Sequence, residues 1–229
     1  MVNGFDIIKN LDLLKKISGK NILISTGGTF EAIDPIRGIS NNSSGKMGLE
    51  LAKEAYIRGA NLTLIVANVS VEIPSIFNVI NVKSSKQMNE AILDIVSDFD
   101  IFISTAAVSD FLPLKADGFK ISSSDEVSIA FKPTVKIIRE IKKNNPEIFL
   151  VGFKAEYGIL EDQIIDCAKK QIEMAGTDLV IANDISNKEC HFGSDYNEIF
   201  LIDDEVVKVP LSSKKTISKI IFDKISKKI

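Results

Sequence analysis

The sequence is poor in the residues that build metal sites and hydrolytic triads. It contains two cysteines, Cys167 and Cys190, and one histidine, His191. Cys190 and His191 are adjacent, which is poor geometry for two ligands of one ion, and protein zinc sites use three or four ligands. With one histidine and no GxSxG pattern, a Ser-His-Asp hydrolase is also disfavoured. We therefore expect no metal ion held by protein side chains alone.

Long apolar runs are missing as well. No run reaches the roughly 18–20 residues needed to cross a bilayer. The N-terminal stretch "MVNGFDIIKNLDLLKK" lacks the charged-then-apolar order of a signal peptide. The formal net charge of −3 at pH 7 argues against nonspecific nucleic-acid binding as the main activity. We expect a cytoplasmic protein with neither a membrane nor a nucleic acid as its partner.

Apolar segments of strand length recur along the chain and alternate with helical patterns. The apolar segments are 21–26, 62–67, 77–82, 101–108, 148–153, 179–184 and 198–203. The helical patterns cover 45–59, 85–99, 160–176 and 212–229, the last with a serine N-cap. This alternation predicts an α/β fold, with a Rossmann-like, mostly parallel sheet flanked by helices. We expect residues 1–229 to form one domain, with 1–18 as an N-terminal helical extension.

One stretch interrupts this alternation. Residues 109–135 show no helical period and contain two short alternating pieces, "FKIS" and "VSIAF", joined by "SSDE". They predict a β-hairpin flap around residues 112–133, inserted where a crossover helix should be. Ligands of an open parallel sheet bind beyond the carboxyl ends of its strands, so the flap is expected to lie over, or project from, that edge.

The first strand ends in "STGGT" (25–29), which contains two consecutive glycines. Gly27 and Gly28 allow a tight turn and a close approach of the backbone to a ligand. No helix opens directly after them, so the GxGxxG dinucleotide fingerprint is absent. The glycines can also serve the turn alone.

The loop "GISNNSSGKMG" (38–48) is similar to a P-loop without being one. The Walker pattern needs four residues between its glycines and a Ser or Thr after the lysine. Here six residues separate Gly38 from Gly45, and Met47 follows the lysine. The loop still brings side-chain amides, hydroxyls and free backbone N–H groups to one helix N-terminus, which attracts an anion.

Three polar residues of this region have two interpretations each. Arg37 is one of three arginines beside 25 lysines, and its planar fork suits phosphate or carboxylate. It can equally be a surface residue. Ser43 and Ser44 can contact an anion, or either can be an ordinary N-cap.

Two further strand ends and the flap carry candidate residues. In "TAAVSDF" (105–111), two alanines allow a flat ligand to lie against the backbone, and Asp110 follows within hydrogen-bonding reach of a ribose or base. Lys120 alternates with apolar residues in the flap, where a cation can stabilise a transferring phosphoryl group. Asn183 and Asp184 end another strand on the ligand side, although Asn-Asp is also ordinary turn chemistry.

Taken together, these pieces are more specific than any one of them. "TGGTFEAIDPIRGISNNSSGKMGLELA", "STAAVSDFLP", "FKIS", "VGFKAE", "TDLVIANDIS" and "F-GSDYNE" occur in one order across nearly the whole chain. From about residue 19 to 225 the chain resembles phosphopantothenate–cysteine ligase of coenzyme A biosynthesis. The resemblance implies that the carboxylate of 4′-phosphopantothenate attacks the α-phosphate of CTP, giving an acyl-cytidylate and pyrophosphate. The amine of L-cysteine then displaces CMP, with Mg²⁺ neutralising the triphosphate.

The resemblance also implies roles for individual residues. The residues expected to act in catalysis are Asn41 and Lys120. Those expected to bind the acyl substrate are Arg37, Ser43, Ser44, Gly45 and Ala107. Those expected to bind the nucleotide are Gly27, Gly28, Ala106, Asp110, Lys120, Phe153, Lys169, Asn183 and Phe192. A homodimer is expected, in which the flap reaches toward the partner subunit, and a separate phosphopantothenoylcysteine decarboxylase is a further candidate partner.

The sequence departs from the family in places that bear on the nucleotide. The family's "KIKK" is "KISS" here, and "NPDI" is "TVKI", which gains Lys136. The helix lysine of bacterial members aligns only approximately, with Lys169 or Lys170 as candidates, and Lys154 stands where alanine is usual. CTP is favoured, and ATP stays open. The start at Met1 followed by a helical pattern favours a standalone chain over half of a fusion.

Two other classes of protein remain as alternatives. A Rossmann-type NAD(P)-dependent oxidoreductase would use a similar sheet, but GxGxxG and a Tyr-x-x-x-Lys pair are absent. A non-catalytic nucleotide-binding subunit would bind nucleotide without releasing pyrophosphate.

Overall fold

The structure is a computed structural model of the 229-residue chain, and it describes residues 12–114, 121 and 126–229. In this part of the chain one sheet runs in the order β12-β11-β10-β9-β6-β1-β4-β5. Its parallel strands are β1 (Asn21–Thr26), β4 (Asn61–Val66), β5 (Asn78–Asn81), β6 (Ile101–Ser104), β9 (Phe149–Glu156) and β10 (Leu179–Asp184). Two antiparallel strands, β11 (Tyr196–Ile202) and β12 (Val206–Ser213), complete one edge. The predicted α/β fold with a mostly parallel sheet is confirmed, and each predicted apolar segment overlaps a strand.

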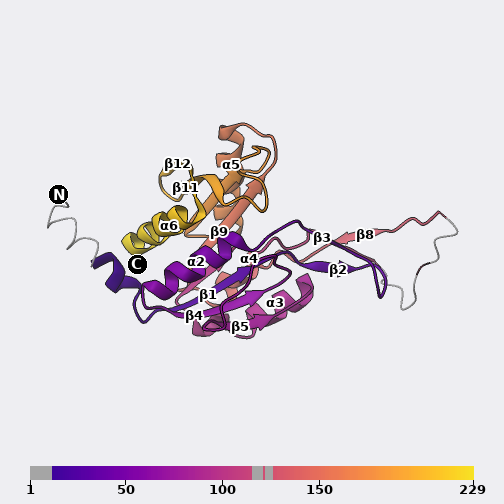
Figure 1. The fold of residues 1–229 in the computed structure, drawn as a ribbon, viewed down its shortest axis with the longest axis horizontal. Coiled ribbons are helices and arrows are strands. Elements are labelled where there is room, and N and C mark those ends of the chain that lie inside the picture. Colours follow the sequence, from indigo (N-terminus) through magenta and orange to yellow (C-terminus); the bar gives the residue numbers. More distant parts are fainter. Residues whose placement is uncertain (1–11, 115–120, 122–125) are drawn as a thin grey trace.

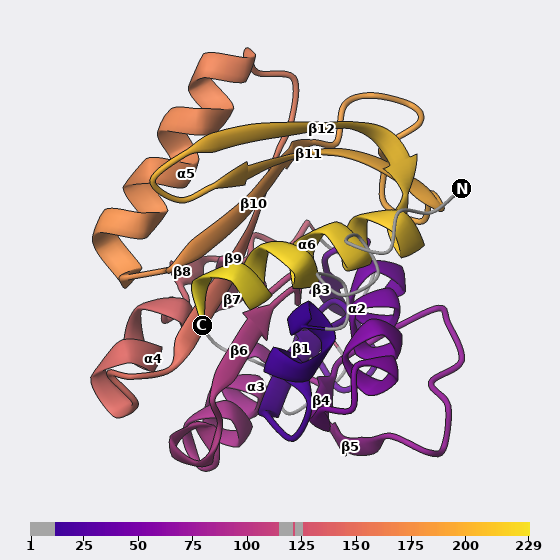
Figure 2. The ribbon, with the colours of Figure 1, turned by 90° about the vertical axis from the view of Figure 1, so that its left-hand side faces the viewer.

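Helices cover both faces of this sheet (Figures 1 and 2). They are α2 (Lys46–Ile57), α3 (Ser85–Leu93), α4 (Ile138–Asn144), α5 (Glu161–Ala175) and α6 (Lys214–Lys228), with a short 3₁₀ helix η1 (Val96–Asp98). In β1, Ile22 and Ile24 belong to the core shared with α2 and α6, whereas Leu23 belongs to the core shared with α3 and α4. Because successive side chains of a strand point to opposite faces, the buried part of the strand is apolar at successive positions rather than at alternate ones.

Local signals set where several helices begin. Ser84 and Gln87 form a capping box at the start of α3, and Ser213 accepts a hydrogen bond of 3.1 Å from the Thr216 amide at the start of α6. The predicted serine cap of the last helix is therefore confirmed. Ser213 also ends β12, so the cap places the first turn of α6 directly beside the end of a strand.

The base of the predicted flap is a hairpin. β7 (Phe111–Pro113) pairs antiparallel with β8 (Phe131–Pro133), so of the predicted second piece "VSIAF" (127–131) only Phe131 belongs to a strand and 127–130 do not. Most of "FKIS", including Lys120, lies outside the described residues. The sequence predicted that the flap takes the place of a crossover helix. This is wrong, because the helix α4 follows the flap and precedes β9. Ile137 and Ile141 are one helical turn apart and both buried, which explains this short helix.

A second hairpin lies beside the flap and was not predicted from the sequence. β2 (Phe30–Ala32) pairs antiparallel with β3 (Gly38–Ser40), and β2 contacts β7. Figure 1 shows the two hairpins extending together from one side of the sheet. We call these two hairpins, with strands β2, β3, β7 and β8 and the turn 33–37, the arm.

The N-terminal extension is described only from residue 12. Residues 12–17 are helical, and Ile17 at their end is fully buried in the core. The rest of the helix predicted over 1–18 lies outside the described residues. Within the part of the chain that the structure describes, no helix has both the length and the apolar character needed to cross a bilayer.

Candidate functional site

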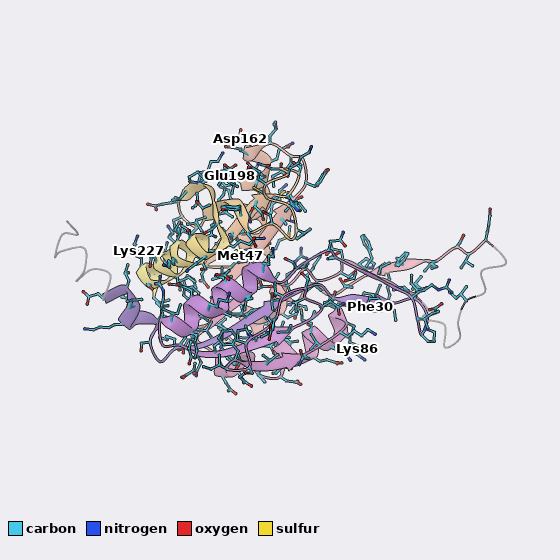
Figure 3. All side chains as sticks on the ribbon, in the orientation of Figure 1. Phe30, Met47, Lys86, Asp162, Glu198 and Lys227 are labelled. Carbon is cyan, nitrogen blue, oxygen red and sulfur yellow. The ribbon has the colours of Figure 1, made fainter. Side chains whose placement is uncertain are left out.

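A cavity of about 430 Å³ lies at the carboxyl ends of β1, β6, β9 and β10. The first turn of α2, the start of α6 and the loop 190–197 complete its wall. Figure 3 labels Met47, the second residue of α2, which lies in this wall. The predicted site residues that the structure brings together here are Asn41, Ser43, Ser44, Gly45, Ala106, Ala107, Asp110, Phe153, Asn183 and Phe192. This edge of a parallel sheet is where ligands are expected.

Other predicted residues do not line the cavity. Gly27, Gly28, Arg37 and Lys169 are absent from its wall. Lys120, predicted to act in catalysis, lies outside the described residues.

The two glycines hold neighbouring loops together instead of facing the cavity. Gly27 has φ 87°, and a Cβ there would lie 2.6 Å from the carbonyl oxygen of Asn68. A Cβ on Gly28 would lie 2.5 Å from the carbonyl oxygen of Asn41. Both approaches exclude a side chain, so Gly28 allows the loop of Asn41 to pack against the end of β1.

Helix α2 begins without a conventional side-chain cap. Its N-cap is Gly45, with φ 78° and no side-chain cap, so neither Ser43 nor Ser44 occupies the N-cap position. A Cβ on Gly48 would lie 2.2 Å from Thr26 Oγ1, which shows how closely the first turn approaches β1. The positive end of the helix dipole and its first amides therefore lie at the cavity wall, where they favour an anion.

Asn41 is oriented by two main-chain carbonyls. Its Nδ2 donates to the carbonyl oxygens of Ala107 and Val108, at 3.2 and 3.3 Å. Both carbonyls belong to the loop after β6. Because the amide nitrogen is used in these bonds, Oδ1 is the atom of this side chain that can accept a hydrogen bond from a ligand.

Four lysines give the cavity wall an excess of positive charge: Lys46, Lys136, Lys154 and Lys214. The first three pair with Asp195 at 2.7 Å, with Asp110, and with Glu156 at 2.9 Å, respectively. Of these three acids only Asp110 lines the cavity itself. An excess of ammonium groups suits a polyanionic ligand.

Lys214 is the most buried of these lysines. It is 8% exposed, and its Nζ donates to the carbonyl oxygen of Ser194. Burial lowers the pKa of Lys214 from its usual value, and the nearby charge of Lys46 lowers it further. Neither lysine was predicted as a site residue, because they begin two helices far apart in the sequence and only the fold brings them together.

The other end of the wall is lined by neutral groups. Asn183 and Asn197 are both buried, and Asn183 Nδ2 donates to Asn197 Oδ1 at 3.2 Å. On α5 the residue in the wall is Gln171, and the exposed Lys169 and Lys170 are not part of it. The structure therefore points to Gln171, where the sequence had suggested a lysine.

Arg37 belongs to the arm. Its Nη2 lies 2.6 Å from Asp34 Oδ2 and also donates to the carbonyl oxygen of Ile121, at 2.6 Å. Hydrogen bonds from Arg37 are the main cause that holds the pKa of Asp34 well below its usual range. Ile121 N donates to Asp34 Oδ2 at 3.2 Å, so the pair ties the β2–β3 turn to the residue that follows Lys120.

Neither a cysteine nucleophile nor a protein metal cage is apparent in the described residues. Cys190 lines the cavity, but burial raises its pKa, which keeps the thiol protonated and unreactive. The described part of the chain has no group of three or more His, Cys, Asp or Glu side chains able to hold an ion. With one carboxylate in the wall, these residues fit Mg²⁺ that is bound mainly by ligand phosphates.

Comparison with known proteins assigns the family. The family described as "DNA/pantothenate metabolism flavoprotein C-terminal domain" matches residues 17–229. The chain belongs to this family. Among its relatives is the coenzyme A biosynthesis bifunctional protein CoaBC of Thermococcus kodakarensis, 43% identical over 217 residues, which covers 93% of this chain and 52% of the relative. The protein of the same name from Methanocaldococcus jannaschii is 36% identical and covers 96% of this chain and 54% of the relative. The chain thus spans about half the length of the curated relatives it matches.

Solved structures of the family agree with the fold. The DNA/pantothenate metabolism flavoprotein of Streptococcus pneumoniae has a TM-score of 0.81 at 28% identity, covering 92% of this chain and 100% of that one. The C-terminal domain of a coenzyme A biosynthesis bifunctional protein CoaBC has a TM-score of 0.77 at 27% identity, covering 93% and 97%. The resemblance noted in the sequence is confirmed at the level of the family.

Proposed function

We propose that this chain is a phosphopantothenate–cysteine ligase, which joins 4′-phosphopantothenate and L-cysteine through an acyl-nucleotide intermediate. The observation that carries the proposal is the cavity, where the N-terminus of α2, four lysines and the fixed amide of Asn41 converge. The relatives named for coenzyme A biosynthesis support it. The substrates are a phosphorylated carboxylate and a nucleoside triphosphate, both strongly anionic, which matches the charge of the wall.

The first step activates a poor acyl donor. A carboxylate oxygen of phosphopantothenate attacks the α-phosphorus of the nucleotide, and the bond from that phosphorus to pyrophosphate breaks. Negative charge builds up on the phosphate oxygens, where Lys46, Lys136, Lys154 and the flap residue Lys120 can stabilise it. Mg²⁺, when bound with the nucleotide, would supply further neutralisation of that charge, beside the carboxylate of Asp110 in the wall.

The second step forms the amide. The uncharged amine of cysteine attacks the acyl carbon, the bond from that carbon to the nucleotide phosphate oxygen breaks and releases the nucleoside monophosphate, and the nitrogen loses a proton to water. Asn41 holds the acyl-nucleotide in position, because its own amide is fixed by the carbonyls of Ala107 and Val108. The other contacts to the acyl substrate and the nucleotide that the sequence predicts, including those of Arg37, Ser43 and Phe192, are also part of this proposal.

Further features extend the proposal beyond the reaction. We take CTP as the nucleotide, with ATP as the alternative. A homodimer is supported by the exposed apolar side chains that the arm presents, among them Ile36, Phe111 and Phe131. The proposal also includes a separate decarboxylase as a partner and a cytoplasmic location. It takes residues 1–229 as one domain.

The proposal is tested by pyrophosphate release. The full chain is mixed with 4′-phosphopantothenate, Mg²⁺ and either CTP or ATP, with cysteine and without it. We expect release that depends on phosphopantothenate, prefers one nucleotide, and is limited to about one equivalent per site when cysteine is left out. A chain that binds nucleotide but releases no pyrophosphate would be the non-catalytic subunit instead. Nucleotide-dependent oxidation or reduction of NAD(P) would favour the oxidoreductase.

A further inference from the structure

Two lysines of the cavity wall are anchored on consecutive carbonyls of one loop. Lys46, the first residue of α2, donates from Nζ to the carbonyl oxygen of Gly193. Lys214, the first residue of α6, donates from Nζ to the carbonyl oxygen of Ser194. The helices α2 and α6 lie side by side (Figure 2), and both lysines line the cavity. The fold thus brings two ammonium groups together at one place in the wall.

Two like charges held close together are unfavourable unless an anion compensates them. The effect is visible in Lys214, whose pKa is lowered first by burial and further by the charge of Lys46. Perturbed groups of this kind gather at functional sites, where a ligand of opposite charge offsets the repulsion. Of the two proposed substrates, the nucleoside triphosphate carries the larger negative charge, and that charge lies in its phosphate chain.

Asp195 is the carboxylate that contacts this pair of lysines. Its Oδ1 lies 2.7 Å from Lys46 Nζ, and its main-chain carbonyl oxygen accepts from the Lys214 amide at 2.9 Å. The hydrogen bond and charge of Lys46, and then the charge of Lys214, lower the pKa of Asp195. Its side chain is 77% exposed and does not line the cavity. Asp195 can therefore affect a ligand in the cavity through the lysines, rather than by direct contact.

The contacts of Lys46 restrict a side chain that is otherwise flexible. A lysine ammonium has three N–H donors at the end of four rotatable carbons. Gly193 and Asp195 accept from Lys46 Nζ, which leaves one donor in a defined direction for a ligand. The charge of Asp195 also favours the protonated form of Lys214. One carboxylate thus orients the first ammonium group and helps the second to stay charged.

We propose that Asp195 is a positioning residue, which holds the Lys46 ammonium beside that of Lys214 so that both bind the phosphate chain of the nucleotide. This proposal rests on the proposed function. In the first step of that function, the bond from the α-phosphorus to pyrophosphate breaks and its electron pair stays on the pyrophosphate. The two ammonium groups stabilise that negative charge.

Removal of this carboxylate has opposite effects under the two interpretations of its role. If Asp195 were only a negative charge near the cavity, Asp195→Asn would strengthen the binding of an anion. If it positions the lysines, the same change weakens that binding. Positioning should dominate, because the carboxylate contacts Lys46 at 2.7 Å, whereas water screens this exposed group from a ligand in the cavity.

The test compares three variants of the full chain: Asp195→Asn, Asp195→Glu and the control Asp204→Asn. Asp204 is another exposed carboxylate paired with a lysine, and it does not line the cavity. We expect Asp195→Asn to raise the KM for the nucleotide and the Kd for inorganic tripolyphosphate by about 3- to 10-fold, the scale of one partly exposed charge interaction. The KM for phosphopantothenate should change by less than about twofold. Asp195→Glu should restore part of the affinity, and Asp204→Asn should behave as wild type.

A double variant separates positioning from a structural role. At pH 7 and in the Lys46→Met background, Asp195→Asn should change the Kd for tripolyphosphate by less than about twofold, because the side chain through which it acts is gone. Melting temperatures of all variants identify any loss of affinity that comes from unfolding.

The pH dependence of nucleotide binding gives an independent readout. Because the charge of Asp195 raises the pKa of Lys214, this lysine should lose its proton at lower pH in Asp195→Asn. The affinity for the nucleotide should therefore begin to fall at a lower pH than in wild type. The other titratable groups that face this amine, Lys46 and Cys190, are the same in both proteins. An unchanged pH profile would contradict the proposal.

Failure of the proposal is distinguishable from failure of the proposed function, because calorimetry with tripolyphosphate needs no turnover. If wild type releases no pyrophosphate but Asp195→Asn still weakens tripolyphosphate binding, the function fails and the role of Asp195 stands. The proposal is overturned by unchanged or tighter binding in Asp195→Asn, by an equal loss in the Lys46→Met background, or by an equal loss for phosphopantothenate. A wild-type chain that does not bind tripolyphosphate would overturn it as well.

Discussion

Asn41 is the residue whose chemistry can be tested most specifically. Its Nδ2 donates to the carbonyl oxygens of Ala107 and Val108. In Asn41→Asp a carboxylate would face these two acceptors, so the loop loses its anchor and the acyl-nucleotide is held poorly. We expect the second half-reaction to slow by on the order of 10²-fold, the scale for losing one positioned polar group. The acyl-nucleotide should then accumulate, which mass spectrometry of quenched reactions can detect.

Asn42→Asp is the matched control for this variant. Asn42 is the exposed neighbour of Asn41 and does not line the cavity, so the same change of charge is made outside the wall. Equal rates in Asn41→Asp and Asn42→Asp, with no intermediate in either, would remove Asn41 from the mechanism.

Lys214 is expected to lower the stability of the fold and to strengthen the binding of an anionic substrate, so one variant tests both effects. Burial and the charge of Lys46 lower its pKa, so the charged amine is unfavourable in the folded state. Because its folded pKa lies below its unfolded one, its destabilising effect is present at neutral pH and diminishes as pH rises through the folded pKa. Lys214→Met should keep or raise the melting temperature at pH 7. It should also raise the KM of an anionic substrate by about 10-fold or more.

Denaturation and steady-state kinetics of the same preparation check both parts. Lys215→Met, next to it in α6 but exposed, is the control. A lower melting temperature together with unchanged substrate KM would show that Lys214 is a structural residue.

Residues close together in the sequence were easier to predict than residues brought together by the fold. The loop from Asn41 to Gly45 reaches the cavity as one segment, and its polar composition was enough to predict a ligand site there. Lys46, Lys214 and Gln171 were missed because each looks like an ordinary helix residue, and their shared location depends on tertiary packing. Lys169 was proposed from an approximate alignment with the helix lysine of the family. It misses the cavity that Gln171 lines, because residues two apart in a helix point to different faces.

At the scale of elements, the Asp34–Arg37 pair links the two hairpins of the arm. Asp34 also accepts from the Ile36, Arg37 and Ile121 amides. Its pKa is lowered, so the stability that this carboxylate contributes is complete above its unfolded pKa of about 3.9 and declines as pH falls below it.

Asp34→Asn should therefore melt below wild type at pH 7, and the gap should narrow below about pH 4, as the carboxyl of wild type becomes protonated. Thermal denaturation at a series of pH values measures this gap. A gap that stays constant from pH 7 to pH 3 would show that the charge of Asp34 plays no part. Asp162→Asn, on the exposed first turn of α5, controls for a simple change in net charge.

The central strands of the sheet were predictable because β1, β4, β6 and β10 are largely buried and read as nearly continuous apolar runs. β12 escaped prediction because it is an edge strand with mostly exposed side chains. β2 and β3 are three residues each, too short for a periodic signal. The helix α4 was not predicted because the interval between β6 and β9 was interpreted as a single hairpin.

For the whole molecule, the arm predicts a second copy of this chain as partner. Phe111 and Phe131 lie on the paired strands β7 and β8 and are exposed. Phe131→Glu should give a monomer in sedimentation experiments and lower the specific activity, because the flap then has no partner subunit to reach. Ile57→Glu, an equally apolar exposed site on α2, should leave the assembly unchanged. A wild-type chain that is monomeric at micromolar concentration with full activity would contradict this.

The central claim is that a carboxylate is activated as an acyl-nucleotide, and isotope transfer tests it most directly. Phosphopantothenate labelled with ¹⁸O in its carboxylate is converted with cysteine and the preferred nucleotide. The account predicts one ¹⁸O atom in the released nucleoside monophosphate, because the oxygen that attacked phosphorus leaves with the nucleotide. Label in inorganic phosphate, or product formed with no label in the nucleotide, would contradict it.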